Sequence, residues 1–154
     1  MNLFLTRLLL VAVALTQGSS LENRPTATAE AKPSAIAQVQ EQSCIANLRT
    51  INVAQNTYWS GETGRGYSQS LRHLGPEGAG LIEPVLARGE KDGYRFRLVP
   101  EQSASDRAPM HYHLLASPVR RLVKNQRSFY TDETGVIRFT TAHRAAKKGD
   151  LPVE

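Results

Sequence analysis

Residues 34–59 read SAIAQVQEQSCIANLRTINVAQNTYW, and this stretch decides the fold. Its large side chains recur at intervals of three and four, the spacing that places them on one face of an α-helix. Ser34, the first residue of the stretch, is a suitable N-cap residue. The pattern predicts a long helix over residues 35–59 whose core-facing stripe contains Cys44, Leu48, Ile51, Gln55 and Tyr58, with Ile36 and Val39 one or two turns earlier.

The polar residues of this helix are predicted to fill its other side and face water: Gln40, Glu41, Asn47, Arg49 and Asn56. The helix should end at Gly61, Gly64 and Gly66, whose GxxGxG order matches neither phosphate-binding glycine pattern, so we interpret them as turn residues. A short second helix is predicted over residues 79–88, ending at Gly89.

After Gly89 the apolar residues alternate with polar ones, which indicates half-buried β-strands. Two strands around residues 94–99 and 110–115 are joined by a polar loop over residues 100–109. A second pair, residues 128–131 and 136–140, flanks the DETG turn. The sequence therefore predicts an α+β domain in which a long helix packs on an antiparallel β-meander of about four strands, against Tyr94, Phe96, Leu98, Met110, Tyr112 and Leu114.

Residues 1–20 have the layout of a secretory signal: Arg7, an apolar run over residues 8–16, then small and polar residues. The run is shorter than a membrane span, although an uncleaved anchor stays open as an alternative. Residues 21–34 are rich in Pro, Thr and Ala and predict a flexible linker. The domain is expected over residues 35–142, and residues 143–154 are expected to form a basic, solvated C-terminal tail.

The chain has 154 residues, a formal net charge of +5 and one cysteine, Cys44. One domain fits this length, and the mild positive charge is not the dense footprint of a dedicated DNA-binding protein. A single thiol cannot form an internal disulfide, so the core must hold the fold. Because Cys44 lies on the apolar stripe, we expect it to be buried and inert; an intermolecular disulfide is the alternative.

The sequence contains no GxSxG, HExxH or CxxC motif, so we predict no catalytic, cofactor-binding or metal-binding residue. His111 and His113 share one face of a strand at a spacing that suits zinc or copper, but no third ligand is evident nearby. We expect them to be surface histidines. The chain is accordingly predicted not to be an enzyme.

Basic residues would gather on the outward face of the sheet and in the following loop. The alternation turns Arg95, Arg97, His111 and His113 to water, and residues 119–127 add further cations. Such a surface could capture a polyanion, such as nucleic acid or acidic polysaccharide. The alternative is a solvated face balanced by acids such as Asp106, Asp132 and Glu133. This predicted basic surface consists of Arg95, Arg97, His111, His113, Arg120, Arg121, Lys124 and Arg127.

Residues 45–139 resemble the globular domain of type IV pilin-like proteins and of the major pseudopilin of type II secretion. The resemblance is carried by NLRTINVAQNTY (47–58), GYSQSLRHLG (66–75), LIEPVLARGEKDGYRF (81–96) and RSFYTDETGVIRF (127–139). It implies a long helix packed on an antiparallel sheet and a structural role in a filament or secretion machine, with no catalytic residues.

The N-terminus departs from the prepilin pattern. In prepilins a hydrophobic helix with a glutamate at its fifth residue follows the cleavage glycine, whereas here Gly18 is followed by a polar segment with Glu22, and the apolar run comes first. The assembly helix is missing, which removes the main buried area of a pilus. We therefore expect a periplasmic or extracellular protein that contacts envelope or filament proteins and keeps no membrane span after signal cleavage.

Overall fold

The computed structural model describes residues 32–61, 66–101 and 108–154. The chain divides into two units, Met1–Glu30 and Ala31–Glu154, and every element named below belongs to the second. The expected signal peptide (1–20), nearly all of the expected linker (21–34), Gly64 and most of the expected loop 100–109 lie outside the described residues. None of the described helices is both long enough and apolar enough to cross a membrane.

The predicted long helix is confirmed as α1, Pro33–Ser60. It begins two residues earlier than predicted, because Pro33 occupies the first helical position, where a missing N–H costs nothing and the fixed φ suits a helix. The N-cap is Lys32, which makes no side-chain capping bond, so the prediction of Ser34 as the cap is wrong. Cys44, Leu48 and Ile51 are fully buried, as the stripe predicts.

The buried side of α1 differs from the predicted stripe near its ends and margins. Ile36 and Val39 are 40% and 62% exposed, because the sheet does not cover this side of the first turns. Asn47 was predicted to face water but is buried, and its amide donates a 3.1 Å hydrogen bond to Asp92. Glu41 likewise faces the sheet, where it binds Arg127. Polar side chains that find partners in other elements therefore widen the contact beyond the apolar stripe.

The sheet has six antiparallel strands in the order β1-β2-β3-β4-β5-β6, so each strand pairs with the next one in the chain. The predicted meander is confirmed, but the prediction of about four strands is wrong. The strands are β1 Glu90–Lys91, β2 Tyr94–Glu101, β3 His111–Pro118, β4 Ser128–Asp132, β5 Arg138–Thr140 and β6 Leu151–Pro152.

The two additional strands, β1 and β6, are the edges of the sheet and have two residues each. Strands of this length leave no alternation in the sequence. The expected solvated tail over residues 143–154 is folded instead: it contains β6, the buried Ala146, and Val153, whose N–H donates a 2.8 Å bond to the Ile137 carbonyl.

The segment of chain that connects α1 to β1 contains two one-turn helices, α2 Leu71–Leu74 and α3 Pro84–Ala87. They stand in place of the predicted helix over residues 79–88. Gly80 has φ +66, which a helix does not accommodate, and Glu83 is extended before Pro84. The helix can therefore start only at Pro84. Leu74, Ile82 and Leu86 are buried and attach this segment to the core.

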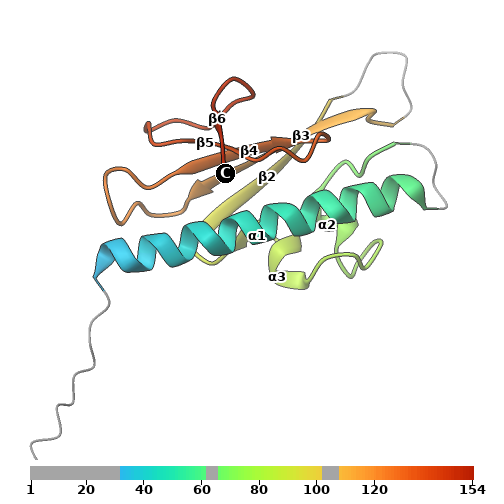
Figure 1. The fold of residues 1–154 in the computed structure, drawn as a ribbon. Helices are drawn as coiled ribbons and strands as arrows, with labels where there is room; N and C mark the ends of the chain where they lie inside the picture. Colours follow the sequence, from blue (N-terminus) through green and yellow to red (C-terminus); the bar gives the residue numbers. More distant parts are fainter. Residues whose placement is uncertain (1–31, 62–65, 102–107) are drawn as a thin grey trace, which may run out of the picture. The chain divides into compact units, whose positions relative to one another are not determined.

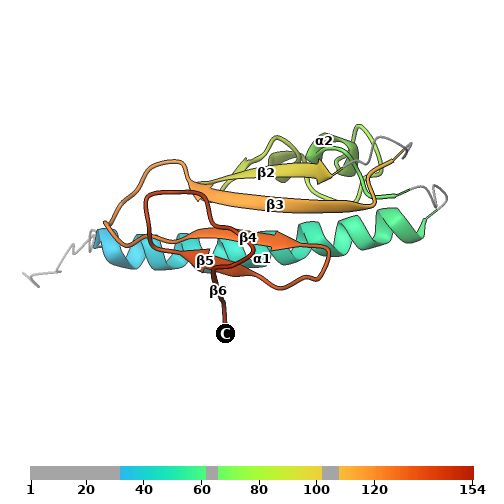
Figure 2. The ribbon, with the colours of Figure 1, turned by 90° about the horizontal axis from the view of Figure 1, so that it is seen from above.

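The core lies between α1 and one face of the sheet, as Figures 1 and 2 show from two directions. β2 and β3 pair with Leu98 opposite Leu114, and the alternation directs buried residues towards α1. Met110 is 44% exposed and lies one residue before β3 begins, so its predicted place in the core is wrong. The main core members are Cys44, Leu48, Ile51, Tyr94, Phe96, Leu114, Ala116 and Phe129.

The opposite face of the sheet is partly covered by residues 141–150, which connect β5 to β6 (Figures 1 and 2). The carboxylate of Asp150 closes this connection on itself: it binds both terminal nitrogens of Arg144 at 2.7 and 2.6 Å and accepts the Lys147 N–H at 2.9 Å. Lys148 reaches Asp132 on β4 with its Nζ 3.8 Å from Oδ2. The outward side chains of β4 are therefore buried although they face away from α1.

Candidate binding surfaces

The predicted basic surface begins on β2, where Arg95 and Arg97 are both exposed and project away from α1. Arg95 forms an ion pair with Glu90 of β1, with 3.3 Å between Nη2 and Oε2. The side chain of Arg97 makes no hydrogen bond or ion pair with any described residue. The predicted orientation of this pair is confirmed, but only Arg97 is without an acidic partner.

The two histidines of β3 also face outwards, and each binds a glutamate. His111 Nδ1 lies 2.8 Å from Glu133 Oε1, and His113 Nδ1 lies 2.8 Å from Glu101 Oε1. The imidazole of His113 also stacks on Tyr130, with 5.8 Å between ring centroids. Within the described residues, no group of three or more His, Cys, Asp or Glu side chains is arranged to hold a metal ion.

Two cations of the loop between β3 and β4 were predicted to lie on the surface but contact other parts of the fold. Arg121 donates to the carbonyl of Gln126, to the Ser128 hydroxyl at 3.2 Å and to the Ala142 carbonyl at 3.3 Å. Arg127 lies over Phe139, 4.9 Å from the ring centroid, and its Nε donates 2.7 Å to Glu41 Oε2. These two arginines hold the loop against β5 and α1.

Most members of the predicted basic surface are therefore already bound to acidic side chains or backbone carbonyls. Arg97, Arg120 and Lys124 remain exposed without an acidic partner among the described residues, whereas the other members are bound to acids or carbonyls. Glu90 and Glu101 were not anticipated from the sequence as balancing acids. Glu90 lies in a two-residue strand and Glu101 beyond the predicted end of β2, so no pattern placed either one opposite a cation.

Ionisable groups on the covered part of this face have shifted pKa values. Burial and the neighbouring Asp132 carboxylate raise the pKa of Tyr130 to about 12. Burial acts to raise the pKa of Asp132, but hydrogen bonds from Thr134 and Tyr130 and the charge of Lys148 outweigh it, so the pKa is lowered. The Thr134 N–H donates 3.0 Å to Oδ1, and the Tyr130 hydroxyl donates 3.2 Å to Oδ2. Asp132 is thus a structural anion within the DETG turn.

The thiol of Cys44 is enclosed by the hydrophobic core. It is fully buried on the inner face of α1, and burial, with a contribution from Glu41, raises its pKa well above the ordinary thiol value. A thiol in this state is a poor nucleophile. The expected burial of Cys44 is confirmed.

The outer face of α1 is unusual in its charge. A solvated helix face normally carries many charged side chains, but Arg49 is the only charged residue among the exposed positions of α1. Val39 and Val53 lie on this face, 62% and 65% exposed. The outer face consists of Pro33, Ser34, Ala35, Ile36, Gln38, Val39, Gln42, Ala46, Arg49, Thr50, Val53, Asn56, Thr57 and Ser60.

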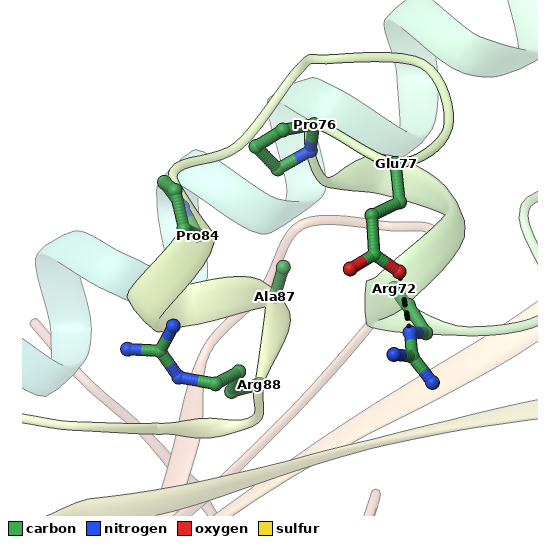
Figure 3. Close-up of a pocket in the computed structure, with 6 residues that line it drawn as sticks. All are labelled: Arg72, Pro76, Glu77, Pro84, Ala87 and Arg88. Carbon is green, nitrogen blue, oxygen red and sulfur yellow. Dashed lines mark hydrogen bonds and ion pairs between the residues drawn. The ribbon is translucent and has the colours of Figure 1, made fainter.

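A pocket of about 560 Å³ lies between α2, the loop that follows it and α3. Figure 3 shows Ala87 between the side chains of Arg72 and Arg88, with Pro76 and Pro84 above it. We call this the proline pocket; it is lined by Arg72, Pro76, Glu77, Pro84, Ala87 and Arg88. Sequence reasoning missed it, and the only available signal was two prolines and two arginines within one segment.

The lining of the proline pocket carries more positive than negative charge. Arg72 Nε lies 2.8 Å from Glu77 Oε2, in a pair whose side chains are 76% and 71% exposed. The side chain of Arg88 is exposed and forms no hydrogen bond or ion pair with any other described residue. The pocket therefore has one cation more than it has anions, beside an apolar lining.

Comparison with protein-family models, with curated proteins and with solved structures gives no significant match to this chain.

Proposed function

We propose that this chain is an exported, non-enzymatic pilin-like protein that acts by contact with other proteins in the cell envelope, in a type IV pilus or a type II secretion system. The arrangement of one long helix across an antiparallel meander is compatible with the pilin-like resemblance of residues 45–139. It supports the proposal without identifying the family, because α+β layers of this kind serve many functions.

The observation that carries the proposal is the outer face of α1. Two exposed valines and a single charged residue among the exposed positions of this 28-residue helix make a surface that loses little hydration energy when a partner covers it. A helix that functioned only in solvent would gain from charged side chains here. Protein contact is the use that this composition suits best.

Capture of a polyanion is the less supported alternative. It requires a continuous set of free cations, and the acids paired with Arg95, His111 and His113 compete with any bound phosphate or carboxylate. Arg97, Arg120 and Lys124 alone would give weak, strongly salt-dependent binding.

Site-specific photocrosslinking in the native host tests the proposal. A photoreactive residue replaces Val53 on the outer face of α1, and a matched one replaces Arg97 on the sheet. We expect the Val53 position to crosslink to pilin or pseudopilin subunits and to lose that product in cells that lack the pilus or secretion machinery. Equal crosslinking at both positions, or a Val53 product that survives removal of both machineries, would contradict the proposal.

Export is tested separately by N-terminal sequencing of the protein recovered from the periplasmic fraction. A new N-terminus near residue 20 is expected. Recovery of intact Met1 in the membrane pellet would support the anchored alternative.

A further inference from the structure

We propose that the proline pocket binds an acidic side chain of a partner protein, presented by an extended segment with apolar residues beside the carboxylate. This inference rests on the proposed contact function and specifies the chemistry of one partner. Arg88 would bind the carboxylate, and Pro76, Pro84 and Ala87 would contact the apolar neighbours.

The charge of the pocket selects an anion. Arg88 has a guanidinium with no partner among the described residues, and Arg72 uses only its Nε on Glu77. Guanidinium groups bind carboxylates through paired N–H donors, so both side chains keep donors available. Glu77 already places one carboxylate beside Arg72, which shows that an acidic group fits at this rim.

The apolar lining selects a peptide over a small inorganic anion. The side chains of the two prolines and the alanine offer no hydrogen-bond donor, and the Ala87 N–H already donates to the Glu83 carbonyl, so they add nothing to the binding of a fully hydrated ion. They do add contact area for the aliphatic side chains that flank an acidic residue in an extended segment.

The backbone that forms the pocket is fixed before any ligand arrives. The N–H groups of Leu81 and Ile82 donate to the Leu74 carbonyl at 2.7 and 3.0 Å, and the Ala79 N–H donates to the His73 carbonyl at 2.8 Å. Gly75 approaches α3 so closely that a Cβ there would lie 2.5 Å from Ala87 Cβ. A preformed pocket loses little conformational entropy on binding.

The test is an NMR titration of the ¹⁵N-labelled full chain with two blocked peptides, acetyl-Leu-Glu-Leu-amide and its uncharged counterpart acetyl-Leu-Gln-Leu-amide. We expect the Glu peptide to shift amide signals within residues 72–88 and the Gln peptide to bind about threefold or more weakly, because it forms no charge-assisted bond. Equal affinity of the two peptides, or shifts spread over the sheet, would overturn the proposal. Sodium acetate forms a third arm: if it matches the Glu peptide in affinity, the apolar part of the proposal is wrong.

Matched charge variants separate the pocket from the general charge of the protein. Arg88→Gln should weaken binding of the Glu peptide about two- to fivefold, the range of an exposed charged contact, whereas Arg97→Gln, with the same change in net charge, should leave it unchanged. Glu77→Gln frees Arg72 and should tighten binding about twofold or more, while the control Glu90→Gln should not. Equal effects in either matched pair would defeat the proposal.

These outcomes are distinguishable from failure of the proposed function. Loss of peptide binding with intact crosslinking at Val53 would remove the pocket but leave the envelope contact. Peptide binding without any host crosslink would leave the pocket proposal in place and remove the envelope contact.

Discussion

The hydroxyl of Tyr112 on β3 donates a 2.9 Å hydrogen bond to the side-chain carbonyl of Asn52 on α1. The Asn52 amide in turn donates 3.0 Å to the hydroxyl of Thr131 on β4. All three side chains are buried, so this chain of bonds joins the helix to two central strands through the core. Its geometry fixes the position of α1 along the sheet more specifically than apolar packing alone.

Replacing Asn52 by Ala should reduce the free energy of unfolding by about 2–4 kcal/mol, because it leaves two buried hydroxyls without their partner. Urea denaturation measures the loss. Asn56→Ala, at an exposed position of the same helix, is the matched control and should cost far less. Since Ala forms helices better than Asn, a similar loss in both variants would contradict the stabilising role assigned to the buried bonds.

Gly78 should tolerate no side chain, whereas its neighbour Gly80 should. A Cβ at Gly78 would lie 2.2 Å from the His73 carbonyl oxygen, which is backbone and cannot move aside cheaply, while nothing lies within 4 Å of a Cβ at Gly80. Gly80→Ala should lower the free energy of unfolding by only about 1 kcal/mol, the strain of its positive φ. Gly78→Ala should lower it clearly more. Thermal unfolding of the two variants compares them, and equal melting temperatures would contradict the packing of this loop.

Asp132 should make stability depend on pH in the acidic range. Its pKa is lowered in the folded protein, so the folded state favours the ionised form; this stabilisation is complete above the unfolded pKa of about 3.9 and is lost as pH falls through the folded value. Asp132→Asn should therefore be less stable than the wild type at neutral pH, and the difference should shrink at acidic pH. Denaturation of both proteins across the acidic range checks this, and a difference independent of pH would refute it.

Cys44 should not react with a thiol reagent in the native state. The side chain is fully buried and its pKa is raised by burial, so both access and thiolate are lacking. Labelling with an aromatic disulfide at neutral pH should proceed only as fast as the protein opens, and denaturant should accelerate it by orders of magnitude. Prompt stoichiometric labelling without denaturant would place the thiol elsewhere than in the core.

The elements with long, periodic patterns could be predicted from the sequence. The stripe through Cys44, Leu48 and Ile51 and the alternation of Tyr94 and Phe96 fixed the helix, the central strands and their shared core, because burial of one face imposes a period on the residues. The turn after Asp132 was also found, since its Gly135 adopts the positive φ that such turns require.

The elements that were not predicted correctly from the sequence lack such a period. β1 and β6 have two residues each, and α2 and α3 are single turns whose limits are set by Gly80 and Pro84. The basic surface was misjudged for a related reason: alternation gives the face of Arg95 or His113, but not the acid that lies opposite on another strand. Contacts between segments distant in sequence, such as Glu41 with Arg127, leave no local signal.

The covering of β4 by residues 141–150 has a consequence for the order of folding. A chain in which β2 through β5 have paired already has its helix-facing core, yet the outward side of β4, with Tyr130 and Asp132, stays wet until the connection that carries Lys148 and Asp150 folds onto it. This face therefore closes after the strands have paired, and a domain trapped before that step would present aromatic surface to other chains.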